Sequence, residues 1–104
     1  MKVIRGHGNE VLGEELGTGA SLIFVNAEPG RGASLHRHDY DEIFVVLEGE
    51  ATMLGGDDGL KLYGGDVAVV PAGQPHGFVN SGDGPLRQID IHLSARFATE
   101  WLGA

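Results

Sequence analysis

Short runs of apolar and β-branched residues, separated by glycine-rich turns, dominate the pattern of this chain. Residues 21–26 read SLIFVN and residues 42–47 read EIFVVL, and both runs are typical of strands that end at turn residues. Further strands are predicted in five places, over residues 51–54, 60–63, 67–70, 76–80 and 86–93. Strands that recur about every ten residues between glycine turns predict an all-β barrel or sandwich instead of βαβ units.

The two ends of the chain depart from this pattern. Residues 1–20 are polar and glycine-rich, which predicts an irregular arm with one or two short strands. Near the C-terminus Ser94 is a suitable N-cap, and Phe97 and Trp101 are spaced for one helix face. We therefore expect a single domain over residues 1–104, made of the arm, a barrel over 21–93 and a short helix over 94–104. Residues 55–59, which read GGDDG, are the predicted loop of a hairpin.

Two of the predicted strands are apolar on both faces. Residues 43–47 read IFVVL and residues 67–70 read VAVV, so both faces of these strands need to be covered. A barrel of this size has too few residues to cover its own outside. The pattern predicts a homodimer that buries an outer sheet face, and the alternative is coverage by the N-terminal arm or the C-terminal helix.

Composition and charge narrow the classes of function. The 104 residues are 41% hydrophobic and carry a formal net charge of −8, which allows one small core and disfavours nucleic acid or an anionic membrane as partner. The chain has no cysteine, so a metal site would need His, Asp or Glu. Neither a signal peptide nor an apolar run of about 18 residues is visible, which predicts a soluble cytoplasmic protein.

Three histidines and one glutamate form the most distinctive chemical pattern. In an extended chain His36 and His38 point to one face, about 7 Å apart, and Glu42 has the same parity. His76 follows the turn PAGQP, which can bring it in from a neighbouring strand. These residues can form a metal site, and they can equally be ordinary residues of an exposed strand and a solvated loop.

The residues around this set resemble the two sequence motifs of the cupin superfamily. The first motif, G-x5-H-x-H-x3-E-x6-G, fits through Gly30, His36, His38, Glu42 and Gly49. The second motif, G-x5-P-x-G-x2-H-x3-N, fits through Gly65, Pro71, Gly73, His76 and Asn80. Together the motifs span about half the chain. The match is specific for the fold and says little about the reaction, because cupins include many kinds of enzyme, storage protein and sensor.

The resemblance implies an all-β cupin jelly-roll, a double-stranded β-helix barrel with one divalent transition metal inside. The ligands that it implies are His36, His38, Glu42 and His76. Three neutral imidazole nitrogens and one carboxylate suit Fe, Mn, Ni, Co, Cu or Zn better than Mg or Ca, which prefer oxygen ligands. Four ligands leave one or two positions open on a six-coordinate ion, as a catalytic metal requires.

The last predicted strand, RQIDIHL, alternates polar and apolar residues. The usual rule places its isoleucines in the core and Gln88, Asp90 and His92 in water. The resemblance to cupins reverses this rule, because the corresponding strand of small cupins tends to line the metal pocket. On that interpretation Asp90 and His92 are candidate catalytic acid–base groups and Gln88 contacts the substrate.

Three aromatic residues lie near the implied ligands in the sequence, and two of them fall on the same strand face as a ligand. Phe44 and Phe78 have the parity of Glu42 and His76, so they are candidate walls of a substrate pocket, or plain core. Tyr40, between His38 and Glu42, is a candidate for the mouth of the pocket or the cap of a bent loop.

Three functions fit this site. The first is a metal-dependent enzyme acting on a small organic molecule, by O2-dependent oxidation as in a dioxygenase or by metal-assisted isomerisation or cyclisation. The second is a non-catalytic module that binds or senses a small ligand. The third is a barrel that its metal merely stabilises, which chelation would unfold. We favour the enzyme, because an open four-ligand site inside the barrel is more than a structural metal requires.

Overall fold

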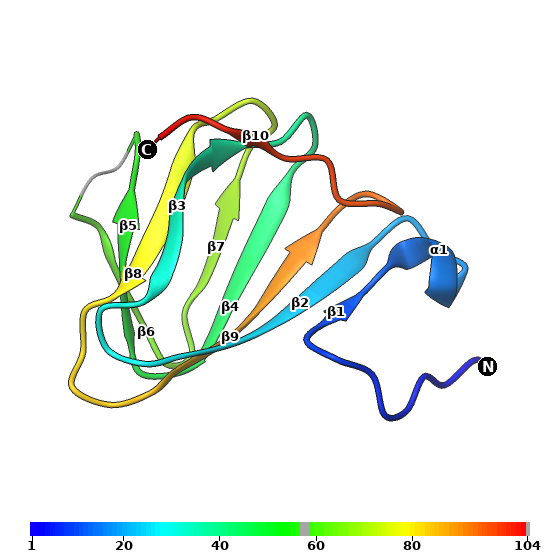
Figure 1. Ribbon diagram of the computed structural model, residues 1–104, viewed down its shortest axis with the longest axis horizontal. Helices are drawn as coiled ribbons and strands as arrows, with labels where there is room; N and C mark the ends of the chain where they lie inside the picture. Colours follow the sequence, from blue (N-terminus) through cyan, green and yellow to red (C-terminus); the bar gives the residue numbers. More distant parts are fainter. Residues whose placement is uncertain (57–58, 104) are drawn as a thin grey trace.

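In the computed structural model, which describes residues 1–56 and 59–103, the chain folds into two five-stranded antiparallel sheets that face each other (Figure 1). The first sheet has the spatial order β1 (Glu10–Val11), β2 (Ser21–Ala27), β9 (Leu86–His92), β4 (Glu42–Glu48) and β7 (Val67–Val70). The second has the order β10 (Glu100–Trp101), β3 (Gly32–Arg37), β8 (His76–Asn80), β5 (Glu50–Leu54) and β6 (Lys61–Tyr63). The predicted fold class, an all-β jelly-roll, is confirmed.

Every strand predicted from residue 21 to residue 93 forms, with ends that differ by no more than one residue. Strands β5 and β6 pair as the expected hairpin, although Asp57 and Asp58 of its loop lie outside the described residues. Strand β3 was missed, because its sequence GASLHR alternates weakly and its pairing with β8 is interrupted by a register shift between Ala33 and His36.

The N-terminal arm contains one short strand, β1, and one helical turn, α1 (Gly13–Leu16). The hydroxyl of Ser21, fully buried, accepts a hydrogen bond from the Gly13 amide and donates one to the Ser94 carbonyl, each at 2.7 Å. Ser21 therefore ties the arm to the C-terminal segment. Among the described residues, no helix is long and apolar enough to cross a membrane.

The C-terminal helix predicted over residues 94–104 is wrong. Residues 93–96 form bends, and Glu100–Trp101 add to the edge of β3 as strand β10, opposite Arg37 and His36. Eleven residues are too few for a stable helix without strong packing, whereas the edge of β3 offers unpaired backbone groups that a strand can satisfy. The segment therefore crosses one opening of the barrel and does not cover the outside of the first sheet (Figure 1).

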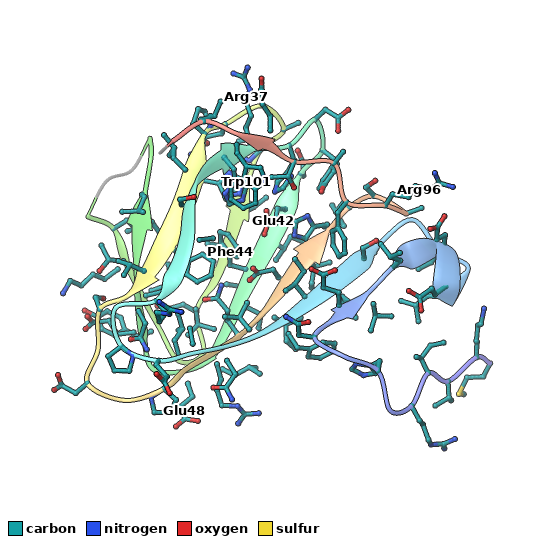
Figure 2. All side chains as sticks on the ribbon, in the orientation of Figure 1. Arg37, Glu42, Phe44, Glu48, Arg96 and Trp101 are labelled. Atoms are coloured by element: carbon teal, nitrogen blue, oxygen red, sulfur yellow. The ribbon has the colours of Figure 1, made fainter. Side chains whose placement is uncertain are left out.

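The interior of the barrel is divided between an apolar and a polar half. The apolar half is a cluster from four central strands and two edge strands of the two sheets, made of Phe44, Val46, Ala51, Met53, Leu62, Val70, Phe78 and Leu86. The polar half lies toward the C-terminal segment and holds buried histidine, glutamate, glutamine and aspartate side chains. Because Phe44 is 1% exposed and touches both halves, its ring forms the boundary between them (Figure 2).

Two motif residues hold the strand connections in place. Gly49, between β4 and β5, has φ 95°, and a Cβ there would lie 2.5 Å from the carbonyl oxygen of Pro85. Only glycine satisfies both conditions. The side chain of Asn80 donates to the carbonyl oxygens of Ala27 and Gly84, both at 2.9 Å, and accepts from the Gly82 amide. Asn80 thereby fixes the loop that leads into β9.

The outer face of the first sheet carries two rows of apolar side chains. Strand register aligns the first row as Leu22, Ile91, Ile43 and Val69, and the second as Phe24, Ile89, Val45 and Val67. On the edge strand β7, Val67 and Val69 are 67% and 65% exposed. The arm covers one corner, where the His7 ring stacks on Phe24 at 5.1 Å. The rest of the face has the character of an interface, since none of the eight side chains is charged.

We propose that a second copy of the chain covers this face. The chain has a net charge of −8, but the patch itself is uncharged, so two copies can meet there without bringing like-charged side chains together. In a two-fold symmetric dimer, the patch of one copy contacts the same patch of the other. Wild-type protein is expected to sediment as a dimer at micromolar concentration. Val69→Glu is expected to sediment as a monomer, because symmetry would bury two unpaired carboxylates.

Leu60→Glu is the control for this prediction, because Leu60 is 48% exposed and precedes β6 in the other sheet. This variant should remain a dimer. A monomeric mass for the wild-type protein, or for both variants, would contradict a dimer through the outer face.

Candidate metal centre

Pairing between strands brings four candidate ligands together inside the polar half of the barrel. His36 lies in β3 opposite His76, the first residue of β8, and Glu42 is the first residue of β4. His38 follows the end of β3. The four residues each offer a ligand atom within 4.8 Å of the others, and none is more than 6% exposed. In Figure 2 the labelled Glu42 lies below Trp101, among the strands of the interior.

Hydrogen bonds fix the same ring orientation in all three histidines. The Nδ1 atoms of His36, His38 and His76 lie 2.6, 2.9 and 2.9 Å from the carbonyl oxygens of Ser34, Ala98 and Gln74. A carbonyl only accepts, so each Nδ1 carries the hydrogen and donates it. Each Nε2 then presents a lone pair to the centre of the cluster, as in metal sites where a backbone carbonyl orients the ligand.

The donor set fits a metal cation. The Nε2 atoms of His38 and His76 each lie 3.0 Å from Oε1 of Glu42, and His38 Nε2 is buried without a hydrogen-bond partner. Lone pairs that face a carboxylate need a cation between them. Two ligand atoms bound about 2.1 Å from one ion at right angles lie about 3 Å apart, which matches these spacings.

The electrostatics favour the ligating forms of Glu42 and His36, but they also favour protonation of His76. Burial raises the pKa of Glu42, but the hydrogen bond from His76 and the nearby histidines outweigh it and hold this pKa below its usual value. Burial lowers the pKa of His36. Burial also opposes the charge on His76, yet its contacts with Glu42 and the Gln74 carbonyl raise its pKa. Without a metal, a proton is therefore shared between His76 and Glu42, and metal binding would displace it.

A fourth imidazole, His92, lies beside this cluster with a different hydrogen-bond arrangement. Its Nδ1 is 2.7 Å from the hydroxyl of Tyr40, which already accepts the Ala98 amide at 3.3 Å. The Tyr40 hydrogen is therefore free for Nδ1, which leaves the His92 hydrogen on Nε2, 3.3 Å from Oε2 of Glu42. Burial lowers the pKa of His92 to about 4. His92 thus faces the second carboxylate oxygen as a neutral donor.

Asp90 is a buried carboxyl group outside the ligand set. It is 5% exposed, lies opposite Phe44 in the β4–β9 pairing, and accepts a hydrogen bond from Gln88 Nε2 at 2.7 Å. Burial, and then the charge of Glu42, raise its pKa well above the usual value. This shift favours the protonated, neutral form of Asp90 at the wall of the site. Gln88, also buried, lies behind it.

A cavity of about 640 Å³ opens beside the cluster. Among the residues that sequence reasoning placed in the site, those lining the cavity are His36, His38, Glu42, Phe44, Phe78, Asp90 and His92. Gln88, Tyr40 and His76 are not part of its lining; Gln88 and Tyr40 hold Asp90 and His92 by hydrogen bonds.

The sequence analysis did not assign three lining residues of this cavity to the site, namely Phe97, Thr99 and Trp101. All three come from the C-terminal segment that was predicted to be a helix. Their signal in the sequence is the pair of aromatic residues Phe97 and Trp101, whose spacing predicted one face of a C-terminal helix. The Phe97 ring meets His92 edge-on and the Trp101 ring lies on His36, each at 4.9 Å.

Comparison with known proteins identifies relatives of this architecture. A family model described as a cupin domain matches residues 23–92. Auxin-binding protein 4 of Zea mays is 32% identical over 75 residues, which are 64% of this chain and 37% of that protein. The chain thus spans little more than a third of this curated relative.

Two solved structures share the fold. An uncharacterised Klebsiella pneumoniae protein with a double-stranded β-helix domain has a TM-score of 0.74 and 26% identity, over 81% of this chain and 70% of that one. Oxalate decarboxylase of Bacillus subtilis, described with Mn(II) centres, has a TM-score of 0.78 and 27% identity, over 89% of this chain and 27% of that one.

The ligand assignment predicts different effects for two substitutions in the site. His76→Ala should abolish tight binding of a transition metal, because it removes a ligand and leaves Glu42 with fewer partners. Asp90→Asn should bind the metal as the wild-type protein does, since Asp90 is outside the ligand set. Metal content after dialysis, measured by mass spectrometry, tests both. Equal loss of metal in the two variants would contradict the placement of Asp90 outside the ligand set.

The raised pKa of Asp90 predicts a pH dependence of stability. A carboxyl whose folded pKa exceeds its unfolded value of about 3.9 destabilises the fold as the pH rises from about 4 to the folded pKa, by at most about 1.4 kcal/mol per pH unit. Asp90→Asn removes this loss. In chelator-treated protein its free energy of unfolding should therefore increase relative to wild type between about pH 4 and pH 8.

Denaturant titrations at the two pH values measure this difference. Asp83→Asn is the matched control, because Asp83 is exposed and its substitution removes the same charge. If Asp90→Asn and wild type changed in parallel with pH, Asp90 would be ionised in the folded protein.

Proposed function

The chain belongs to the cupin domain family, and on this basis we propose that it is a metal-dependent enzyme that acts on a small organic molecule. The reaction is either an O2-dependent oxidation, as in a dioxygenase, or a Lewis-acid isomerisation or cyclisation. The observation that carries the proposal is that one cavity is lined both by candidate ligands and by Asp90, a buried carboxyl group with a raised pKa that the ligand set does not use.

The ligands of the metal would be His36, His38, Glu42 and His76. A bound transition metal supplies Lewis-acid chemistry, and a redox-active one also supplies electrons. The neutral imidazoles and single carboxylate suit Fe, Mn, Ni, Co, Cu or Zn. Mn(II) is the first ion to test, because the oxalate decarboxylase with a similar fold is described with Mn(II) centres.

The protein side chains around the cavity account for binding and proton transfer. Phe44, Phe78 and Phe97 offer apolar surface to a small substrate. Protonated Asp90 can donate a hydrogen bond or a proton to a substrate oxygen, and Gln88 holds its other oxygen in place. His92 is neutral and held by Tyr40. The pair Asp90 and His92 therefore offers an acid and a neutral imidazole in one cavity.

A non-catalytic function is the second candidate. The Zea mays relative is named as an auxin-binding protein, and the aromatic cavity with a neutral carboxyl group can hold a small organic ligand without transforming it. The substitution Asp90→Asn distinguishes the two candidate functions. If the protein only binds a ligand, the substitution should change its affinity for that ligand. If the protein is an enzyme, the substitution should reduce turnover of the substrate.

The test begins with the metal that co-purifies from the native host, followed by turnover with phenols, diketones, sugars and small carboxylic acids, with and without O2. A substrate consumed only with O2 identifies an oxidation, and one consumed without O2 identifies a Lewis-acid reaction. Asp90→Asn is expected to lower kcat by about 10²- to 10⁴-fold while metal content is unchanged. Metal-loaded protein that binds a ligand of this panel and never converts it would favour the binding protein.

A further inference from the structure

The C-terminal strap, residues 94–102, lies beyond the match to the family model, which ends at residue 92, and yet it contacts three imidazoles of the site. Its strand β10 pairs with β3, with Trp101 opposite His36. The Trp101 ring lies 4.9 Å from the His36 ring, and the Phe97 ring meets His92 edge-on at 4.9 Å. The strap therefore forms one wall of the metal centre (Figure 2).

His38 depends on the strap in a way that the other two histidine ligands do not. The acceptors for Nδ1 of His36 and His76 are the carbonyls of Ser34 and Gln74, each two residues earlier in the same stretch of chain. The acceptor for Nδ1 of His38 is the carbonyl of Ala98, 60 residues away. His38 follows the end of β3, so its own strand does not orient its ring.

The strap forms hydrogen bonds with two residues of the loop that follows β3, His38 and Tyr40. The Ala98 carbonyl accepts from His38, while the Ala98 amide donates to the hydroxyl of Tyr40 at 3.3 Å. The Thr99 hydroxyl lies 3.3 Å from the same His38 nitrogen. The rings of His38 and Tyr40 stack at 4.8 Å. Removal of the strap would therefore free the His38 ring to rotate its Nε2 lone pair away from Glu42.

The attachment of the strap itself is weak. Trp101 is 63% and Leu102 39% exposed, and the Leu102 amide bonds to the Leu35 carbonyl at 3.0 Å. Its two ion pairs, Arg37 with Glu100 and Arg96 with Glu14, have exposed partners, and solvent-exposed ion pairs contribute little to stability. A segment held in this way opens far more easily than the strands of the core.

We propose that the strap is a positioning element of the metal centre, so that its docking and metal binding strengthen each other. Docking holds His38 in its ligating orientation, and a metal that captures His38 Nε2 in turn holds the ring against Ala98. By linkage the two effects have the same magnitude. This inference rests on metal binding at the cluster and is independent of whether the protein catalyses a reaction.

The first test compares metal affinity in a charge-reversal cycle at the Arg37–Glu100 ion pair, which changes no group that bonds to His38. Arg37→Glu opposes two carboxylates at the strap and should weaken Zn(II) binding about 3- to 10-fold, measured by competition with a chromogenic chelator. Glu100→Arg in the same protein should restore the affinity. The direct electrostatic effect of Arg37→Glu would instead strengthen Zn(II) binding, because an added negative charge near the site attracts a cation.

Removal of residues 97–104 gives a second variant, which keeps Ser94 and its bond to Ser21. Zn(II) affinity should fall about 10- to 100-fold, as for the loss of other groups that orient a metal ligand. If this truncated protein fails to unfold cooperatively, the charge-reversal cycle decides the question alone.

The effect of metal binding on docking of the strap is measured by hydrogen exchange in the full chain. Zn(II) should slow exchange of the Leu102 amide by a factor comparable to the affinity change, and should not do so in His76→Ala, whose altered ligand is oriented by Gln74 and not by the strap. Unchanged affinity in the folded truncated protein, or tighter binding by Arg37→Glu, would overturn the coupling alone. A wild-type protein that binds no metal would overturn the metal centre and the coupling with it.

Discussion

The interior of this protein is organised around one buried carboxylate. Glu42 is 2% exposed, and a buried carboxylate without compensation is strongly unfavourable. Here it is surrounded by His38, His76 and His92 at 3.0 to 3.3 Å. The carboxylate thereby dictates which way each ring has to face, and it provides the negative charge that a cation at the centre requires.

The hydrogen-bond arrangement separates ligands from their supports. Of the three rings that donate through Nδ1 to backbone carbonyls, those of His38 and His76 place Nε2 3.0 Å from Glu42 Oε1. His92, held by Tyr40, faces Oε2 with a hydrogen. Histidine side chains around Glu42 therefore serve two purposes, as candidate metal ligands and, in His92, as a neutral hydrogen-bond donor. The distinction follows from what each Nδ1 meets, which is a carbonyl in one case and a hydroxyl in the other.

Stability and chemistry occupy different halves of the same barrel. The apolar cluster from Phe44 to Leu86 supplies the packing that holds the two sheets together, so the polar half can hold groups that burial disfavours, such as neutral Asp90. The relatives share this framework over only part of their own length. What differs between cupins is therefore to be sought in the wall of the cavity and in the segments that cover it, here Phe97, Trp101 and Asp90.

The sequence by itself determined strands β2 and β4 to β9, the resemblance to the family and the set of four candidate ligands. Strand positions follow from local alternation and from turns such as Gly49, and the ligand spacing His-x-His-x3-Glu lies within one stretch of chain, so both are encoded locally. The sequence also showed that the last strand alternates, but the family resemblance was needed to choose which face points inward.

Only the tertiary structure decided what lies at the ends of the chain and what orients each ligand. The segment from Ser94 to Leu102 has a helical spacing of aromatic residues, yet its regular structure is the short strand Glu100–Trp101, because the free edge of β3 satisfies its backbone and its rings meet His36 and His92. Local pattern does not record such an edge. The contact between Ala98 and His38 joins residues 60 positions apart, and a pairing of this kind exists only once both sheets have formed.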